Sequence, residues 1–231
     1  MEIKKLLLCC CADYQHIADE SIRKLFAAAK QAGIEVELCP DLCYEAVENP
    51  EFLVKLAEEN IAIAACFPRT VQALFARAKV TPATVLNLRT EPLQKILQFL
   101  KIEPATGPSD LQLPVYGKKW KAWFPVLDYE LCSDCGKCLD YCLFGVYSIR
   151  NKKIIVTHPK LCKTDCPACA RVCPDKAIIF PKHIDAAING EQEQDAAVTK
   201  STLPENRFEG DLYARLAKRR KEQRKGKLIK E

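Results

Sequence analysis

Residues 132–142 read CSDCGKCLDYC, and residues 162–174 read CKTDCPACARVCP. The first stretch separates its cysteines by two, two and three residues, and the second by three, two and three residues before a proline. Three cysteines at two-residue gaps wrap a loop around one metal centre, whereas the fourth points towards a second centre. The two stretches therefore predict two neighbouring metal centres that exchange their fourth ligands.

This pattern resembles the bacterial-type ferredoxins with two [4Fe–4S] clusters, over about residues 124–183. The resemblance implies a small α+β ferredoxin domain, with strands near residues 146–149 and 177–180. Two departures are Leu143, where the family has proline, and the three-residue gap after Cys162. The implied ligands are Cys132, Cys135, Cys138 and Cys173 for one cluster, and Cys162, Cys166, Cys169 and Cys142 for the other.

Zinc is the alternative metal for these cysteines, because paired Cys-x2-Cys knuckles also build zinc sites. Zinc ribbons place two such pairs far apart, whereas here four cysteines fall within residues 132–142. The spacing therefore favours iron–sulfur clusters over zinc.

The composition is that of a folded protein, since 48% of the 231 residues are hydrophobic and 28% are charged. No uncharged apolar run approaches the roughly 20 residues needed to cross a bilayer. Residues 6–8 are too short for the ~7–15-residue core of a signal peptide. We therefore expect a cytoplasmic chain, in which 14 cysteines indicate metal binding rather than disulfides.

Residues 1–101 are expected to form an α/β domain. Apolar runs alternate with segments whose apolar residues recur at helical spacing, which predicts an open parallel sheet of four strands with helices. Asp19, Thr70 and Thr90 are the expected helix N-caps, and Pro50 suits the first turn of another helix. The expected strands are residues 3–8, 34–38, 61–65 and 85–88.

Six cysteines follow the strands of this domain and therefore meet at one edge of the sheet, where α/β proteins usually bind ligands. The alternative is that they act as small core residues. Their common location favours a metal site, for zinc or for an iron–sulfur cluster. His16 is interpreted as a solvated residue at the start of the first helix. The six are Cys9, Cys10, Cys11, Cys39, Cys43 and Cys66.

Residues 3–95 resemble the N-terminal domain of the heterodisulfide reductase A family, a domain associated with a [4Fe–4S] cluster. The motifs that match are Cys9-x-Cys11, Cys39, residues 66–70 (CFPRT) and residues 86–89 (LNLR). The sequence departs from the family where Ala12 replaces a glycine and where a Pro-Gly turn is missing after Cys39. The resemblance implies Cys9, Cys11, Cys39 and Cys66 as ligands of a third cluster, with Cys10 and Cys43 as possible substitutes and Arg69 and Arg89 nearby.

That family continues into a flavin-binding domain with a Gly-x-Gly-x-x-Gly turn, which this sequence lacks, so no flavin is expected. A linker is expected over residues 102–123, where Trp120 and Trp123 should pack on a neighbouring domain. A polar arm and a basic helix are expected over residues 184–231. The last 25 residues hold ten Lys or Arg against four Asp or Glu, so the basic charge gathers there.

Clusters ligated by four thiolates leave no iron open to a substrate, so the sequence predicts an electron carrier without a catalytic site of its own. Its expected partners are flavin- or metal-containing oxidoreductases, with an acidic surface for the basic helix. One alternative is an electron-input subunit of a heterodisulfide-reductase-like or hydrogenase complex. Others are an iron–sulfur redox sensor with a basic tail, or a thiol redox module. The tail contains no nucleic-acid-binding motif, which argues against DNA or RNA.

Overall fold

The computed structural model describes residues 3–59, 61–107, 110–114 and 120–192. Its N-terminal part contains a parallel four-stranded sheet in the order β2-β1-β3-β4. Each strand lies within two residues of its expected position, which confirms the α/β fold. The strands are β1 (Lys5–Cys9), β2 (Glu35–Cys39), β3 (Ala62–Ala65) and β4 (Thr84–Asn87).

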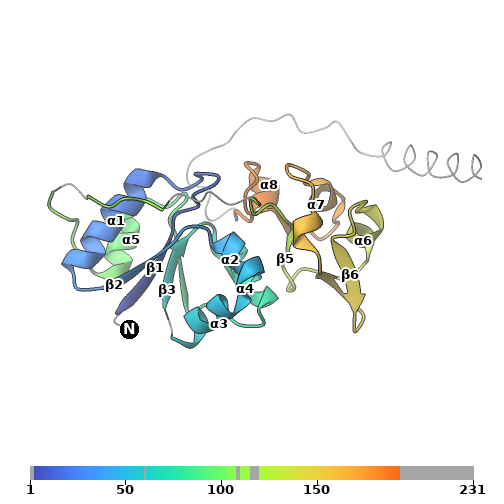
Figure 1. The fold of residues 1–231 in the computed structure, drawn as a ribbon, viewed down its shortest axis with the longest axis horizontal. Helices are drawn as coiled ribbons and strands as arrows, with labels where there is room; N and C mark the ends of the chain where they lie inside the picture. The colour runs from blue at the N-terminus through green and yellow to red at the C-terminus, as the bar shows by residue number, and fades with distance from the viewer. Residues whose placement is uncertain (1–2, 60, 108–109, 115–119, 193–231) are drawn as a thin grey trace, which may run out of the picture. The chain divides into compact units, whose positions relative to one another are not determined.

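Helices cover both faces of this sheet, with α1 and α5 on one face and α2, α3 and α4 on the other (Figure 1). Alternate residues of β1 enter the two cores: Leu6 and Leu8 pack on the first face, and Leu7 on the second. A strand that is buried on both faces is apolar throughout, which explains the unbroken Leu run. The helices are α1 (Asp19–Gln31), α2 (Leu42–Glu48), α3 (Pro50–Glu58), α4 (Pro68–Arg77) and α5 (Leu93–Leu100).

The strand order positions the candidate site. The chain runs from β1 to its neighbour β2 and then crosses back to pair β3 with the other side of β1. The carboxyl ends of β1 and β3 therefore border the crevice in which open α/β sheets bind ligands. Cys9 closes β1 and Cys66 directly follows β3, so the crevice is lined with sulfur.

Three expected N-caps are wrong. Asp19 is the first residue of α1, and its cap is Ala18. Thr70 lies inside α4, because the preset φ angle of Pro68 suits the first helical turn. Thr90 lies before α5, where its hydroxyl accepts a hydrogen bond from the Asn87 amide.

The C-terminal part of the described chain consists of short elements. β5 (Val126–Leu127) pairs antiparallel with β8 (Ile178–Ile179), and β6 (Tyr147–Arg150) forms a hairpin with β7 (Lys153–Val156). Strands therefore occur near both expected positions. Further elements here are α6 (Lys137–Tyr141), the 3₁₀ turn η1 (Pro159–Leu161) and α7 (Ala168–Val172).

The start of the expected polar arm packs against the protein instead. Residues 186–189 form α8 (Ala186–Asn189), in which Ile188 and Asn189 are buried. The Thr70 hydroxyl donates to the Asn189 carbonyl at 2.8 Å, which ties α8 to α4. The expected basic helix lies outside the described residues. Within the described ranges, no helix combines the length and apolar character that a membrane span requires.

Candidate metal centres

The first cysteine quartet surrounds a recess in the C-terminal part. The recess contains about 290 Å³ of atom-free space, part of it open to solvent. Gly136 adopts φ +78° at the start of α6, a conformation that favours glycine and turns the loop between the cysteines. The cysteines that line it are Cys132, Cys135, Cys138 and Cys173.

These four sulfurs lie close enough to repel one another when ionised. Burial and the charges of Cys132 and Cys173 raise the pKa of the Cys138 thiol to about 11. Burial and its neighbours Cys173 and Cys135 also raise the pKa of Cys132. Such thiols remain protonated near neutral pH until a bound cation stabilises their thiolates. The Ala177 N–H already points at the Cys173 sulfur, at 3.4 Å.

The second quartet shows the same mutual influence. Burial and the charges of Cys169, Cys166 and Cys142 raise the pKa of Cys162 to about 12. The Tyr147 hydroxyl donates a hydrogen bond to the Cys169 sulfur at 3.0 Å, inside the core. In both quartets the structure brings together the three cysteines of one sequence group and the fourth of the other. That these residues bind metal stays a prediction.

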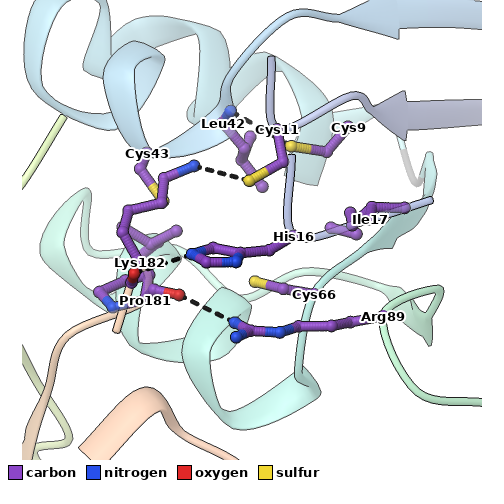
Figure 2. Close-up of a pocket in the computed structure, with 12 residues that line it drawn as sticks. Cys9, Cys11, His16, Ile17, Leu42, Cys43, Cys66, Arg89, Pro181 and Lys182 are labelled. Carbon is purple, nitrogen blue, oxygen red and sulfur yellow. Dashed lines mark hydrogen bonds between the residues drawn. The ribbon is translucent and has the colours of Figure 1, made fainter. Parts of the chain in front are cut away.

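A second sulfur-lined pocket lies at the crevice between β1 and β3, with about 320 Å³ of atom-free space that includes open solvent. Three of the four predicted ligands of the third cluster line it, together with Cys43 (Figure 2). Cys39 does not line it. The pocket cysteines are Cys9, Cys11, Cys43 and Cys66.

The two remaining cysteines have other contacts. Cys39 is the cross-strand partner of Cys9, and it donates a hydrogen bond that lowers the pKa of the Cys9 thiol. Cys10 lies in the core beneath α1 and α5, where its Sγ is 3.9 Å from the Leu8 carbonyl oxygen. The pocket geometry therefore favours Cys43 over both of them as a fourth ligand.

Helix α2 positions Cys43, and the sequence pattern did not predict this helix. The Asp41 carboxylate caps it by accepting hydrogen bonds from the backbone N–H groups of Cys43 and Tyr44. An Asp before an apolar residue is the signal that could have revealed α2. Its seven residues are too few to show a clear helical period.

A buried lysine from the C-terminal part enters this pocket, and it too was missed. The Lys182 Nζ lies 2.7 Å from the Asp41 carboxylate. It also lies 3.1 Å from the Cys11 sulfur (Figure 2). Burial acts to lower the pKa of Lys182, but the negative charge of Asp41, and those of the nearby cysteines when they are ionised, raise it well above its ordinary value. The amine therefore remains an ammonium group.

His16 is not a solvated helix-start residue as expected. It precedes α1, is half-buried and lines the pocket, where its Nε2 lies 2.8 Å from the Lys182 carbonyl. Burial lowers the pKa of His16. The contact fixes the backbone of Lys182 beside the cysteines, and its partner is 166 residues away in the sequence.

The structure separates the two arginines expected near the site. Arg89 lines the pocket, stacks over the Phe67 ring at 4.9 Å and donates to the carbonyls of Pro181 and His183. Arg69 lies outside the pocket lining and pairs with Asp128 of the C-terminal part at 2.7 Å. Both arginines thus join the two parts of the described chain.

The donor set of these sites is sulfur, which suits iron–sulfur clusters or zinc. Among the described residues, no three or more Cys, His, Asp or Glu side chains lie close enough to bind a single metal ion. Two buried donors near the crevice, the Tyr14 hydroxyl and the Trp123 indole N–H, have no hydrogen-bond partner within the described part. Such N–H and O–H groups are of the kind that hydrogen-bond cluster sulfurs.

Comparison with known proteins decides the family. A 54-residue segment is 37% identical to an uncharacterized ferredoxin of Methanocaldococcus jannaschii and covers 86% of that protein. A 54-residue segment is also 35% identical to a ferredoxin of Methanothermococcus thermolithotrophicus and covers 88% of it. The chain belongs to the ferredoxin family. The matched segment is therefore an iron–sulfur segment of the electron-transfer class.

The ferredoxin relationship covers only part of the chain. Another uncharacterized ferredoxin of M. jannaschii is 45% identical over 69 residues, which are 29% of this chain and 47% of that protein. The chain thus spans about half the length of that relative. No protein-family model matches the chain. The ferredoxin family therefore accounts for iron–sulfur chemistry in less than a third of the sequence.

Proposed function

We propose that this ferredoxin relays single electrons through three [4Fe–4S] clusters, from a low-potential donor to a partner oxidoreductase. The observation that supports it most strongly is the assembly of the two crossed cysteine quartets. Each quartet fills the coordination of one cluster, so no iron is left open to a substrate. The proposed ligands are Cys132, Cys135, Cys138 and Cys173 for the first cluster, and Cys162, Cys166, Cys169 and Cys142 for the second.

A third cluster is proposed for the crevice pocket of the sheet domain. The resemblance to the N-terminal domain of the heterodisulfide reductase A family supports a cluster there, with Cys9, Cys11 and Cys66 among its ligands. Cys43 lines the pocket and Cys39 does not. The proposed fourth ligand is therefore Cys43. When bound, the cluster supplies one-electron redox chemistry, and the pocket residues hold it away from water.

Contacts between the two parts support one continuous electron path. Tyr14 of the sheet domain contacts Trp123, with ring centroids 6.3 Å apart. Tyr14 also lies beneath the Lys182 ammonium that enters the pocket, at 5.5 Å. Trp123 belongs to the core that includes Cys138 and Cys169 of the two quartets. Packed side chains thus connect the crevice pocket to the quartets.

A second candidate role is an electron-input subunit of a heterodisulfide-reductase-like or hydrogenase complex. The ordered motifs of residues 3–95 favour it, because the domain that they resemble is part of such an enzyme. Anaerobic co-purification of a catalytic or flavin-containing protein would support this role. Recovery of the chain alone, with full electron-carrier activity, would favour the independent carrier.

The relay is tested by counting electrons. The anaerobic protein is reduced fully and then titrated with a one-electron acceptor, and we expect about three electrons per chain, one per cluster. Cys66→Ser should reduce the count to about two, whereas Cys10→Ser should leave it unchanged, since Cys10 does not line the pocket. A count of two in the wild-type protein would remove the third cluster, and a count of zero would refute the relay.

A further inference from the structure

Lys182 is the feature of the crevice pocket that ligation does not explain. Its side chain is 3% exposed, and its ammonium contacts the Asp41 carboxylate and the Cys11 sulfur. It belongs to the segment that follows β8, so the C-terminal part inserts a positive charge among the cysteines of the sheet domain (Figure 2).

Stability gives little reason to bury this charge. A buried lysine is rare unless it is paired, and a buried ion pair is often no more stable than apolar residues of the same volume. Asp41 does not need the lysine for its helix-capping role, because its Oδ1 accepts the α2 N–H groups and its Oδ2 meets Lys182. The cation therefore acts chiefly on what the pocket holds.

We propose that Lys182 sets the reduction potential of the third centre, by stabilising the extra negative charge of its reduced state. This inference rests on the proposed third cluster. One-electron reduction adds one negative charge to a group that four thiolates already make anionic. Net charge and hydrogen bonds to sulfur are the protein's main controls on cluster potential. Lys182 supplies both at once, through its charge and its N–H contact with the Cys11 sulfur.

The other charges that face the pocket define the expected signs. Asp41 opposes the lysine, Arg89 adds a second cation, and burial keeps His16 mainly neutral. Removing the lysine leaves the Asp41 anion beside the centre, which should disfavour the reduced state. Removing the Asp41 charge should favour it. If the ion pair only stabilised the fold, removing either partner would not be expected to shift the reduction potential in opposite directions.

The test is a redox titration of the full chain, followed by the EPR signal of the third centre. A unit charge a few ångströms away in a partly buried site changes a charge equilibrium by more than tenfold. Lys182→Met should therefore lower the reduced-to-oxidised ratio at a fixed potential at least about tenfold, a shift of at least about 59 mV to lower potential. Asp41→Asn, which can still cap α2, should shift the potential upwards.

Two further variants serve as controls. Lys182→Arg keeps the charge and should shift the potential less than Lys182→Met does. Lys5→Met removes the same charge from the opposite end of β1, where the lysine is exposed and paired with Glu59, and should leave the potential unchanged. Iron content per chain shows that each variant is loaded.

The outcomes separate this inference from the function on which it rests. A wild-type protein without a third EPR-active centre refutes the third cluster and the role of Lys182 with it. A third centre whose potential is the same in Lys182→Met and Asp41→Asn, both fully loaded, refutes only the role of Lys182. If Lys182→Met does not fold, the upward shift in Asp41→Asn decides, and its absence overturns the inference.

Discussion

The hydrogen bond from Tyr147 to Cys169 gives a prediction about the second quartet alone. Tyr147 is 4% exposed, and its hydroxyl lies 3.0 Å from the Cys169 sulfur. Burial and the nearby Cys169 charge raise the pKa of Tyr147 well above its ordinary value, so the hydroxyl keeps the proton that it donates. The substitution Tyr147→Phe removes this donor and preserves the ring that packs in the core.

The expected effect is a lower potential for the second centre. A hydrogen bond to sulfur stabilises the more negative, reduced state, so its loss makes reduction harder. A neutral hydrogen bond contributes about 0.5–1.5 kcal/mol. If most of this favours the reduced state, the midpoint falls by about 20–60 mV for one electron.

The assay is an anaerobic EPR redox titration of both quartet centres in the same sample. Tyr129→Phe is the matched control, since no hydrogen bond from Tyr129 to a sulfur is found in the described part, and it should change neither midpoint. An unchanged or higher midpoint for the second centre in Tyr147→Phe would refute the reasoning. So would an equal fall at both centres, which would indicate a global change in packing.

Three other consequences follow from the structure. Arg69→Met leaves the mostly buried Asp128 carboxylate without its cation, although the carboxylate still accepts a hydrogen bond from the Glu130 N–H. We expect the free energy of unfolding to fall by about 2–3 kcal/mol, which is less than the roughly 3–5 kcal/mol lost when a fully buried ion pair is broken. The melting midpoint of the cluster absorbance should then fall by about 4–12 °C. Cys43→Ser should lose about four irons per chain, whereas Cys39→Ser should lose none. The metal-free protein should lose stability as the pH rises above about 8.5. Burial raises the pKa of Cys169 in the folded state to about 12, whereas an exposed cysteine has a pKa of about 8.5. The thiolate therefore forms first in the unfolded chain, which favours unfolding.

Each of these has a result that would contradict it. The control for Arg69→Met is Lys24→Met, which removes an exposed ion pair and should change the free energy of unfolding by less than ~1 kcal/mol. If the two substitutions had equal effects, the ion pair between Arg69 and Asp128 would stabilise the fold no more than an exposed pair does. If iron were lost from Cys39→Ser but kept in Cys43→Ser, the fourth ligand would be Cys39, as the sequence motif implies, and not Cys43. For the pH effect, the cluster-loaded protein should show a weaker decline, since bound thiolates no longer titrate; equal declines would rule out the cysteines as its cause.

The local patterns of the sequence were sufficient to predict the sheet and to group the cysteines. A strand buried on both faces needs an unbroken apolar run, so Leu6–Leu8 marked β1 without further information. The ferredoxin-type spacing is also local, because each loop wraps its own centre. The strand and the cysteine spacing both depend on residues close together in the sequence, which is why the sequence alone predicts them.

The content of the crevice pocket could not be predicted in the same way. Lys182 and Asp41 are 141 residues apart, and no periodicity links them. Cys39 and Cys43 lie at and just after the end of β2, and only the unexpected helix α2 directs one of them into the pocket. Sequence order showed that sulfur gathers at this edge, whereas the choice among the sulfurs depends on packing between distant segments.

The central claim is that cysteines in both parts of the chain hold iron–sulfur clusters. Its most direct test is the iron and acid-labile sulfide content of the anaerobically purified protein, measured together with zinc. Three clusters predict about twelve irons and twelve sulfides per chain, with zinc absent. About eight of each would restrict the clusters to the crossed quartets, and a colourless protein loaded with zinc would contradict the account.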